Sequence, residues 1–316
     1  MKTRPLGNSD LLITSIGVGT WAIGGPDGNY NWGPQDDQDS IAAIHRALDL
    51  GINWIDTAPA YGKGHSEEVV GKAIKGLTPK PYLFTKNSLV WGSDRVIKNN
   101  LKADSIRREC EQSLNRLGVE QLDLLQIHWP NPDPDIEEAW GEMARLKKEG
   151  KVRWIGVSNF SPAQMKRCGT IAAVTSLQPP YSAARRDIER EILPFCKEQG
   201  MGVLVYSPMQ AGILSGRMTR ERVQNLPEGD WRRKNDQFQE PNLTRNLALQ
   251  DLFIKIAKRH NHGGAVAAIA WVLRNPEVTG AIVGVRSPAQ VAELSAAGEF
   301  RLSAEEEAEV SRFLSA

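Results

Sequence analysis

The chain of 316 residues has little cysteine, no long hydrophobic run and no excess of charge of one sign. Its three cysteines, Cys110, Cys168 and Cys196, are far apart and form no CxxC pair. Neither a disulfide framework nor a zinc site is therefore expected, and we predict no metal site. No uncharged apolar run approaches the roughly 18 residues that a membrane-spanning helix needs, so no membrane partner is expected.

The charge of the chain is balanced, with 39 lysines and arginines against 38 aspartates and glutamates, for a formal net charge of +1. This balance provides no basic surface for nucleic acid, so we expect no nucleic-acid partner. The first residues contain no apolar core of a secretion signal, and the cytoplasm is the expected compartment. Hydrophobic residues at 41% and charged residues at 24% are typical of a globular protein.

The chain does contain a regular alternation of short apolar segments with amphipathic ones. Several amphipathic segments begin at a candidate N-cap and stop at a glycine. Glycine suits the end of a helix because the residue there often adopts a left-handed backbone conformation. The strand candidates are residues 15–20, 52–57, 82–87, 122–128, 152–157, 175–178, 202–206 and 279–284. The helix candidates are residues 39–50, 66–75, 102–117, 136–149, 161–171, 188–198, 243–259, 265–274, 287–296 and 303–314. The N-cap candidates are Asp39, Ser66, Ser161 and Ser303, and the C-cap candidates are Gly51, Gly76, Gly118, Gly150 and Gly200.

Eight strand–helix units predict an α/β fold, a (β/α)₈ TIM barrel, with residues 1–316 forming a single domain. A doubly wound sheet is the alternative, but roughly five to seven strands and a phosphate-binding glycine turn would suit it better. Residues 1–14 are expected to form an N-terminal β-hairpin that could plug the N-terminal mouth of the barrel. Residues 209–242 are a long polar loop after the seventh strand, of the kind that is usually a lid or disordered. The last two helix candidates lie beyond the eighth strand and add extra C-terminal helices.

Four polar residues lie where such a barrel would gather them at one end. Asp56, Lys86 and His128 each close an apolar strand candidate, and Tyr61 follows just beyond one. In a barrel of this kind the active site lies at the C-terminal ends of the strands. A phenol with a pKa near 10 is a poor acid at neutral pH, and an adjacent ammonium lowers that pKa. A carboxylate would hold the lysine charged, and a neutral histidine could donate to a carbonyl oxygen. Taken singly, each could instead be a cap, a solvated rim charge or a packed core residue.

The second half of the chain contains groups that suit a flat, anionic cofactor. Ser158 and Asn159 follow the fifth strand candidate, and Gln178 ends the sixth, so that their side chains suit an amide. Tyr206 ends the seventh and could stack on a flat ring. Arg286 lies after the eighth, where many barrels bind phosphate at a helix N-terminus, although it could simply be a surface charge. No GxGxxG follows a strand and no Walker A sequence occurs, so neither a Rossmann nor a P-loop site is supported.

Tryptophans fall just after the strands or in the adjoining loops. Trp21, Trp32, Trp91 and Trp129 could wall an apolar substrate pocket beside His128, although packing at the barrel rim is the plainer interpretation. They favour a substrate with an aromatic or apolar portion. Other polar residues that could contact hydroxyls or a carboxylate of the substrate are Asn87, Arg95 and Arg232.

With these residues in this order, the chain resembles an aldo-keto reductase over essentially its whole length. The resemblance rests on the segments GINWIDTAPAYG at 51–62, GKA at 71–73, QIHWP at 126–130, GVSNF at 156–160 and YSP at 206–208. Within the family it is most similar to the bacterial branch that includes general-stress and inositol-related reductases. It is also similar to the β subunits of voltage-gated potassium channels.

The resemblance implies a reduction of aldehydes or ketones to alcohols with NADPH, NADH being possible but weaker, on a monomer or weak homo-oligomer. Tyr61 would be the general acid, Lys86 would lower its pKa, Asp56 would pair with Lys86, and His128 would orient the carbonyl. Tyr206 would stack against the nicotinamide. The cofactor-binding set that it implies is Gly19, Thr20, Trp21, Asp56, Ser158, Asn159, Gln178, Tyr206, Ser207, Pro208, Gln210, Gly212, Arg217, Gly284, Arg286, Gln290 and Glu293.

The sequence departs from the family pattern at two positions. The adenosine motif often ends Glu-Asn but here reads Glu293-Leu294, and a lysine common near the 2′-phosphate is replaced by Gly284, with Arg286 two residues on. The alternative to a reductase is an NADP-binding regulatory or sensor protein with slow turnover. A phosphate-handling lyase or isomerase is a further option, but it would leave Tyr206 and Asn159 without a role.

Overall fold

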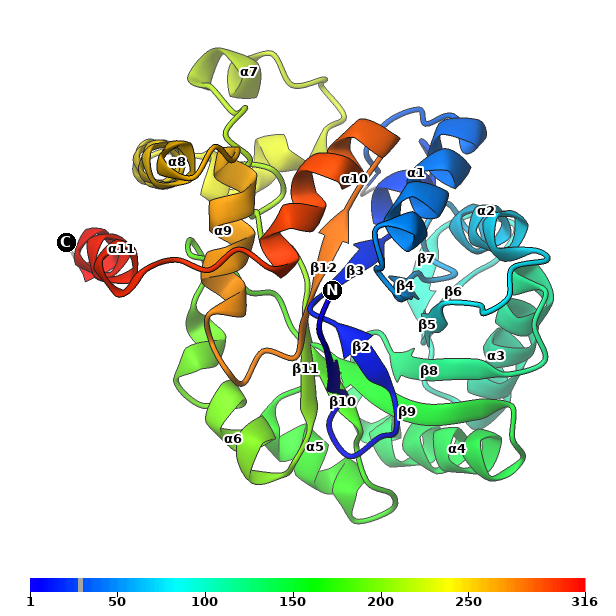
Figure 1. The fold of residues 1–316 in the computed structure, drawn as a ribbon. Helices are drawn as coiled ribbons and strands as arrows, with labels where there is room; N and C mark the ends of the chain where they lie inside the picture. Colours follow the sequence, from blue (N-terminus) through cyan, green and yellow to red (C-terminus); the bar gives the residue numbers. More distant parts are fainter. Residues whose placement is uncertain (28–30, 316) are drawn as a thin grey trace.

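The computed structural model of the protein describes residues 1–27 and 31–315 (Figure 1). Within these residues, eight strands close a parallel barrel, in the spatial order of the chain. They are β3 (Ile16–Gly19), β4 (Trp54–Asp56), β5 (Tyr82–Asn87), β8 (Leu122–Ile127), β9 (Val152–Ser158), β10 (Ser176–Gln178), β11 (Gly202–Val205) and β12 (Gly280–Gly284). The barrel closes where β12 pairs with β3, and the predicted (β/α)₈ fold is confirmed.

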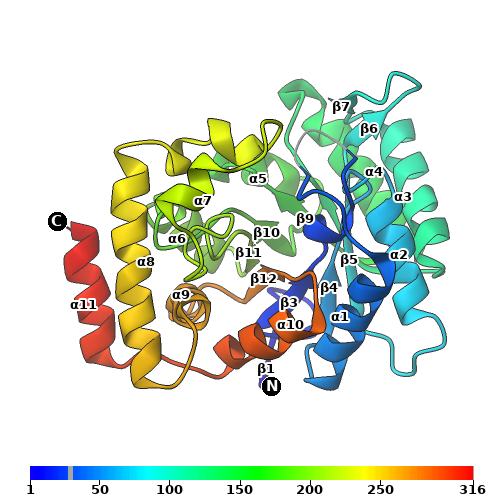
Figure 2. The same ribbon diagram turned by 90° about the horizontal axis from the view of Figure 1, so that it is seen from above.

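Helices surround the barrel, as the view from above shows (Figure 2). Those that follow the first six barrel strands are α1 (Asp37–Asp49), α2 (His65–Ile74), α3 (Ala103–Leu117), α4 (Ile136–Lys148), α5 (Pro162–Gly169) and α6 (Ile192–Glu198). The later ones are α7 (Arg220–Gln224), α8 (Asn242–Arg259), α9 (Gly264–Leu273), α10 (Pro288–Leu294) and α11 (Ala304–Ser315). Helix α11 packs against α8 at one edge, so the predicted extra C-terminal helices are confirmed. No helix among the described residues is long and apolar enough to cross a membrane.

The helix ends follow local backbone chemistry, with two corrections to the predicted N-caps. Helix α1 begins earlier than predicted, because Asp36 rather than Asp39 accepts from the first free backbone N–H groups. Helix α2 begins after Gly64, and the hydroxyl of Ser66 donates instead to Thr20 in the barrel wall. The capping box at Ser161 is confirmed. The five predicted C-cap glycines all have positive φ angles, the conformation that glycine adopts without steric cost.

The predicted helix at 188–198 is also interrupted. A short 3₁₀ turn at Asp187–Glu189 precedes α6, which starts only at Ile192. Pro194 explains the break, because proline has no N–H to donate to the preceding turn and fits only the first turn of a helix. With α6 starting at Ile192, Pro194 lies in that first turn.

The N-terminal hairpin closes the bottom of the barrel. Strand β1 (Thr3–Pro5) pairs antiparallel with β2 (Leu12–Thr14), as predicted. Leu6, Leu11 and Ile13 are completely buried. They pack with side chains that point into the barrel, namely Trp54, Phe84, Leu124, Leu204 and Ile282. The interior is therefore filled from below, and an open cavity can form only at the other end of the barrel.

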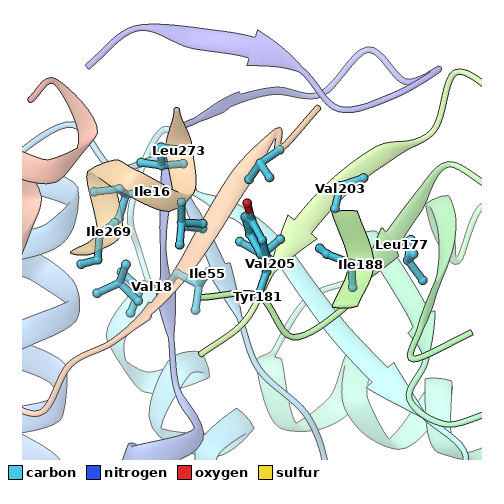
Figure 3. Close-up of a cluster of buried hydrophobic side chains, with 14 of the residues drawn as sticks. Ile16, Val18, Ile55, Leu177, Tyr181, Ile188, Val203, Val205, Ile269 and Leu273 are labelled. Atoms are coloured by element: carbon cyan, nitrogen blue, oxygen red, sulfur yellow. The ribbon is translucent and has the colours of Figure 1, made fainter. Parts of the chain in front are cut away.

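A second, larger core lies between the strands and the helices. Outward-pointing side chains of the strands pack there: Ile16 and Val18 lie beside Ile269 and Leu273 of α9, and Val203 lies beside Ile188 (Figure 3). Both faces of the strands are thus covered, which accounts for their continuous apolar sequences. This double packing fixes the strand ends on which the candidate site is built.

Two features of the loops were not predicted. A small antiparallel hairpin, β6 (Leu89–Trp91) with β7 (Ile97–Asn99), follows β5. The long segment 209–242 is ordered, with α7 and two 3₁₀ turns at Trp231–Lys234 and Asp236–Phe238. Buried Ile213, Leu214 and Phe238 anchor it on the barrel.

Candidate active site

The candidate site is a layer of polar side chains that stands on the apolar floor of the barrel. Side chains two residues apart on a strand point to the same face. Asp56 therefore follows the floor residue Trp54 on β4, and Lys86 follows Phe84 on β5. On both strands, the inward-pointing side chains change from apolar to charged over two residues.

The ammonium group of Lys86 is the centre of this layer. Its Nζ lies 2.6 Å from Oδ1 of Asp56, 2.9 Å from the backbone oxygen of Thr57 and 3.3 Å from the hydroxyl of Tyr61. The side chains of Lys86 and Asp56 are only 0% and 2% exposed. A buried ammonium needs such compensation, because leaving water costs an ion several kcal/mol. Lys86 is thus in direct contact with both Asp56 and Tyr61, two of the other three predicted catalytic residues.

The electrostatics of the site keep Lys86 charged and Tyr61 protonated. Burial alone would lower the pKa of Lys86, but Asp56 and Tyr61 more than compensate, so its pKa is raised. Burial raises the pKa of the Tyr61 phenol more than the positive charge of Lys86 lowers it. We expected Lys86 to bring this pKa below its usual value. Lys86 does act in that direction, but the loss of water around the phenol outweighs it.

His128 completes the group at the end of β8. Its ring centroid lies 6.0 Å from that of Tyr61, and the two rings are nearly perpendicular. Burial, reinforced by the charge of Lys86, holds the pKa of His128 well below its usual value. His128 is therefore neutral at physiological pH and has one ring N–H to donate.

Two glutamines support Asp56 from other strands of the barrel, Gln126 from β8 and Gln178 from β10. Gln178 donates through Nε2 to Oδ2 of Asp56 at 2.8 Å, and Gln126 donates to the same oxygen at 3.4 Å. Gln178 was predicted to contact the amide group of a cofactor, and that contact stays a prediction; in the structure its amide nitrogen donates to Asp56. Gln126 was missed, although a polar residue inside the apolar run of β8, two positions before His128, was a usable signal.

Ser158, Asn159 and Tyr206 form a connected group across the mouth from Lys86. Asn159 donates to the backbone oxygen of His128 at 3.0 Å and accepts from the hydroxyl of Tyr206 at 2.9 Å. Its φ of +64° turns the side chain back over the strand ends. Ser158 donates to the backbone oxygen of Gln178 at 2.8 Å. The structure therefore brings these predicted residues to one place.

An aromatic wall stands beside Tyr61. The ring of Trp21 lies 6.4 Å from Tyr61, 5.6 Å from Trp32 and 5.4 Å from Trp231. Trp231 belongs to the ordered segment 209–242, which thus contributes to the wall, and it was not among the predicted pocket residues. The guanidinium of Arg232 lies 4.7 Å above the ring of Trp32 and is paired with Asp230.

The other predicted pocket residues are distributed differently. Trp129 is 40% exposed and lies parallel to the ring of His128. Trp91 lines a separate cavity of about 470 Å³ together with α3 residues, and Arg95 pairs with Asp27. Asn87 is wholly buried against Met143 of α4, because it alternates with Lys86 along β5, so the suggested contact with substrate is wrong.

The predicted pyrophosphate segment follows β11. Ser207, Gln210, Ala211 and Gly212 all have positive φ angles, which curl the backbone, while Pro208 is buried. Successive N–H groups in such conformations form concavities that bind anions. Arg217, from the end of this segment, pairs with Glu293 of α10 at 2.7 Å. Two predicted cofactor residues, from the segments after the neighbouring strands β11 and β12, are therefore joined to each other.

The remaining predicted cofactor residues belong to the neighbouring strand ends. Thr20 is buried, and its hydroxyl donates to the backbone oxygen of Asp56, so its side chain is part of the barrel wall. A side chain at Gly19 would collide with Ile282, whereas Gly284 faces open space. Gln290 accepts from the backbone N–H of Arg286.

The residues present fit a nicotinamide dinucleotide. Amide and hydroxyl groups of Ser158, Asn159 and Gln178 lie together near the ring of Tyr206, which suits a carboxamide beside a flat ring. The curled backbone of 207–212 and the cations Arg217 and Arg286 suit phosphates. Both sets lie at the same end of the barrel as Lys86.

Comparison with known proteins agrees with this geometry. The sequence profile of the Aldo/keto reductase family matches residues 15–314. The NADH-specific methylglyoxal reductase of Escherichia coli (strain K12) is 35% identical, over 96% of this chain and 95% of its own. The solved glycerol dehydrogenase AKR11B4 from Gluconobacter oxydans is 38% identical, with a TM-score of 0.91 over 99% of this chain and 95% of its own.

A solved aldo-keto reductase from Klebsiella pneumoniae in complex with NADPH is 30% identical, with a TM-score of 0.76 over 99% of this chain and 95% of its own. The agreement extends over nearly the whole barrel in each case. The chain therefore belongs to the aldo/keto reductase family and is an oxidoreductase that uses NAD(P)H.

Proposed function

We propose that the protein reduces small aldehydes or ketones to alcohols, preferring NADPH, with Tyr61 as the proton donor. The observation that carries the proposal is the buried ammonium of Lys86, placed between the carboxylate of Asp56 and the hydroxyl of Tyr61. This arrangement holds a protonated phenol next to a positive charge that stabilises the phenolate once the proton has left.

The reaction needs a hydride at the carbonyl carbon and a proton at the carbonyl oxygen. NAD(P)H, when bound, supplies the hydride. Tyr61 transfers its hydroxyl proton to the oxygen, and Lys86 stabilises the resulting phenolate. Neutral His128 donates a hydrogen bond to the same oxygen and orients the carbonyl. Asp56, held by Gln178, keeps Lys86 charged and in place.

The cofactor would be held along the second half of the mouth. Ser158, Asn159 and Gln178 would bind the carboxamide, and Tyr206 would lie against the nicotinamide. Segment 207–217 would bind the pyrophosphate and Arg286 the adenosine end. The existence of an NADH-specific relative and of an NADPH-bound relative makes dual use of the two cofactors part of the proposal.

The pocket favours a carbonyl with an apolar or aromatic portion. Trp21, Trp32 and Trp231 form its wall, and pairing with Asp230 neutralises Arg232. Methylglyoxal, the substrate named for one relative, is a small dicarbonyl that such a pocket also admits. The cytoplasmic location, the single domain and the monomer or weak homo-oligomer remain predictions from the sequence.

The test is oxidation of NADPH and of NADH, followed by absorbance, against aromatic aldehydes, dicarbonyls and aldoses. We expect Tyr61→Phe to lose about 10²- to 10⁴-fold in turnover, the usual contribution of a positioned general acid, while still binding cofactor. Tyr82→Phe is the matched control, because Tyr82 lies at the start of β5, at the opposite end of the strand from Lys86.

An unchanged turnover of Tyr61→Phe would overturn the role of Tyr61. Tight binding of NADPH without turnover of any carbonyl, or of any alcohol in reverse, would support the sensor alternative. If neither dinucleotide bound, the proposal as a whole would fail.

A further inference from the structure

The guanidinium of Arg286, the cation proposed for the adenosine end of the cofactor, is held by residues 32–35, which directly precede α1. Its Nε donates to Oε1 of Gln35 at 2.6 Å, and its Nη1 donates to the backbone oxygen of Trp32 at 3.2 Å. Its Nη2 donates to the backbone oxygen of Pro34. An arginine has five side-chain N–H groups, so at least three are committed before any phosphate arrives.

Gln35 is bonded to Arg286 in both directions. Besides accepting from Nε, it donates through Nε2 to the backbone oxygen of Arg286 at 2.9 Å. A further bond from Nε2 to the hydroxyl of Ser40 in α1, at 3.1 Å, fixes the glutamine. Gln35 and Arg286 are 251 residues apart in sequence, so the pair joins two loops that only the closed barrel brings together.

We propose that Gln35 is a specificity-determining residue for the cofactor, because its side-chain oxygen competes with a 2′-phosphate for the guanidinium of Arg286. The inference rests on the proposed function and deepens it. A phosphate is bound best by two parallel N–H groups of one arginine edge. The edge that contains Nε is available to NADPH only after Gln35 has been released.

The competition affects only one of the two dinucleotides. NADH has a hydroxyl where NADPH has the 2′-phosphate, so it gains little from a released Arg286. Gln35 therefore reduces the preference for NADPH over NADH. The lysine found near the 2′-phosphate in related sequences is replaced here by Gly284, which provides no second cation. Together these residues predict an enzyme that uses both cofactors.

The test is a set of dissociation constants for NADPH and NADH, measured by quenching of protein fluorescence in the full-length enzyme. We expect Gln35→Ala to tighten NADPH relative to NADH by about fivefold, the worth of one ordinary hydrogen bond. We expect Gln35→Glu to do the opposite, because a carboxylate pairs with Arg286 more strongly and repels the phosphate. Gln38→Ala, an exposed glutamine on α1, is the control and should leave the ratio unchanged.

Repeating the Gln35 replacements in an Arg286→Ala background tests whether they act through Arg286. The NADPH-to-NADH ratio should then no longer respond to residue 35. The inference is overturned if Gln35→Ala weakens NADPH selectively, which would mean that Gln35 positions Arg286, or if both dinucleotides weaken equally, which would mean a structural role. Binding of NADH by each variant shows that it is folded. Wild-type protein that binds neither dinucleotide would instead refute the proposed function and, with it, this inference.

Discussion

Two ion pairs at the same end of the barrel have nearly the same length and different surroundings. Lys86 and Asp56 lie 2.6 Å apart with side chains 0% and 2% exposed, whereas Arg217 and Glu293 lie 2.7 Å apart with side chains 61% and 33% exposed. The first pair is on adjacent strand ends, and the second joins a loop to a short helix. The buried pair cannot lose a partner without leaving an uncompensated charge, whereas water can replace either partner of the exposed pair.

The two pairs belong to parts of the barrel mouth for which we propose different functions. The side that we propose for proton transfer is fixed by strands with both faces packed. The phosphate-binding part that we propose for the cofactor, segment 207–217 with Arg286, is built from loop residues that bond to neighbouring loops and helices and can exchange those bonds for a ligand. Substitutions at the buried pair should therefore have larger effects than substitutions at the exposed pair.

Asp56→Asn should be the most damaging of these changes. It leaves Lys86 as a buried cation without a counter-charge, so we expect a loss of about 3–5 kcal/mol in the free energy of unfolding, measured with urea. Asp133→Asn breaks an exposed pair with Arg167 and should cost less than about 1 kcal/mol. Equal losses in the two variants would contradict the contrast between buried and exposed pairs.

Glu109→Gln should stabilise the protein at alkaline pH. Burial raises the pKa of Glu109 to about 7 from an ordinary 4.5. The folded state therefore holds this proton more tightly, and wild-type stability is lost as the pH rises from about 4.5 through 7. We expect the variant to gain up to about 3 kcal/mol over wild type at pH 9 and almost nothing at pH 4.

The control for this prediction is Glu111→Gln, an exposed glutamate on the same helix that pairs with Lys151. It should show no alkaline gain. A Glu109→Gln variant that is no more stable than wild type at pH 9 would mean that the carboxylate is compensated in the folded protein.

The rate of carbonyl reduction should be insensitive to pH over the neutral range. Burial places the pKa of Tyr61 above its usual 10 and that of His128 well below its usual 6.5, so neither group changes protonation between about pH 6.5 and 9. Reduction should decline only above about pH 10, where Tyr61 loses its proton. A step in kcat near pH 6.5 that disappears in His128→Gln would show that His128 is more exposed to protonation than its burial implies.

Glu293→Gln should have the smallest effect on stability. Because the pair with Arg217 is exposed, we expect a change of less than about 1 kcal/mol in the free energy of unfolding, reduced further in high salt. A loss above about 2 kcal/mol would mean that this contact holds the segment after β11 in place and is not an adjustable bond.

The sequence predicted the strand ends well, because hydrophobic pattern and strand period determine them. Asp56 and Lys86 could be placed together since each is one step beyond an inward apolar residue on neighbouring strands. Their roles remain predictions, whereas their contact is a feature of the structure. Gln126 could have been found in the same way, because it is a polar residue on the inward face of β8, two positions before His128.

The loop residues could not be placed in this way, because loop contacts depend on distant chain segments with no common period. Trp231 reaches Trp21 only through the course of segment 209–242, and Gln35 meets Arg286 only when the barrel closes. The sign of the Tyr61 pKa shift also depended on burial, which a sequence motif does not show. Trp231 and Gln35 thus belong to loops, and the Tyr61 shift reflects its burial in the pocket.

The most direct test of the account is the single-turnover rate of hydride transfer in enzyme saturated with NADPH, for Tyr61→Phe, Lys86→Met and the double variant. Fluorescence titration with NADPH shows that each variant is folded. If Lys86 acts through Tyr61, the double variant will be no slower than the slower single variant. If the two losses multiply, Lys86 and Tyr61 act independently. That result would contradict the proposal that Lys86, paired with Asp56, supports proton donation by Tyr61.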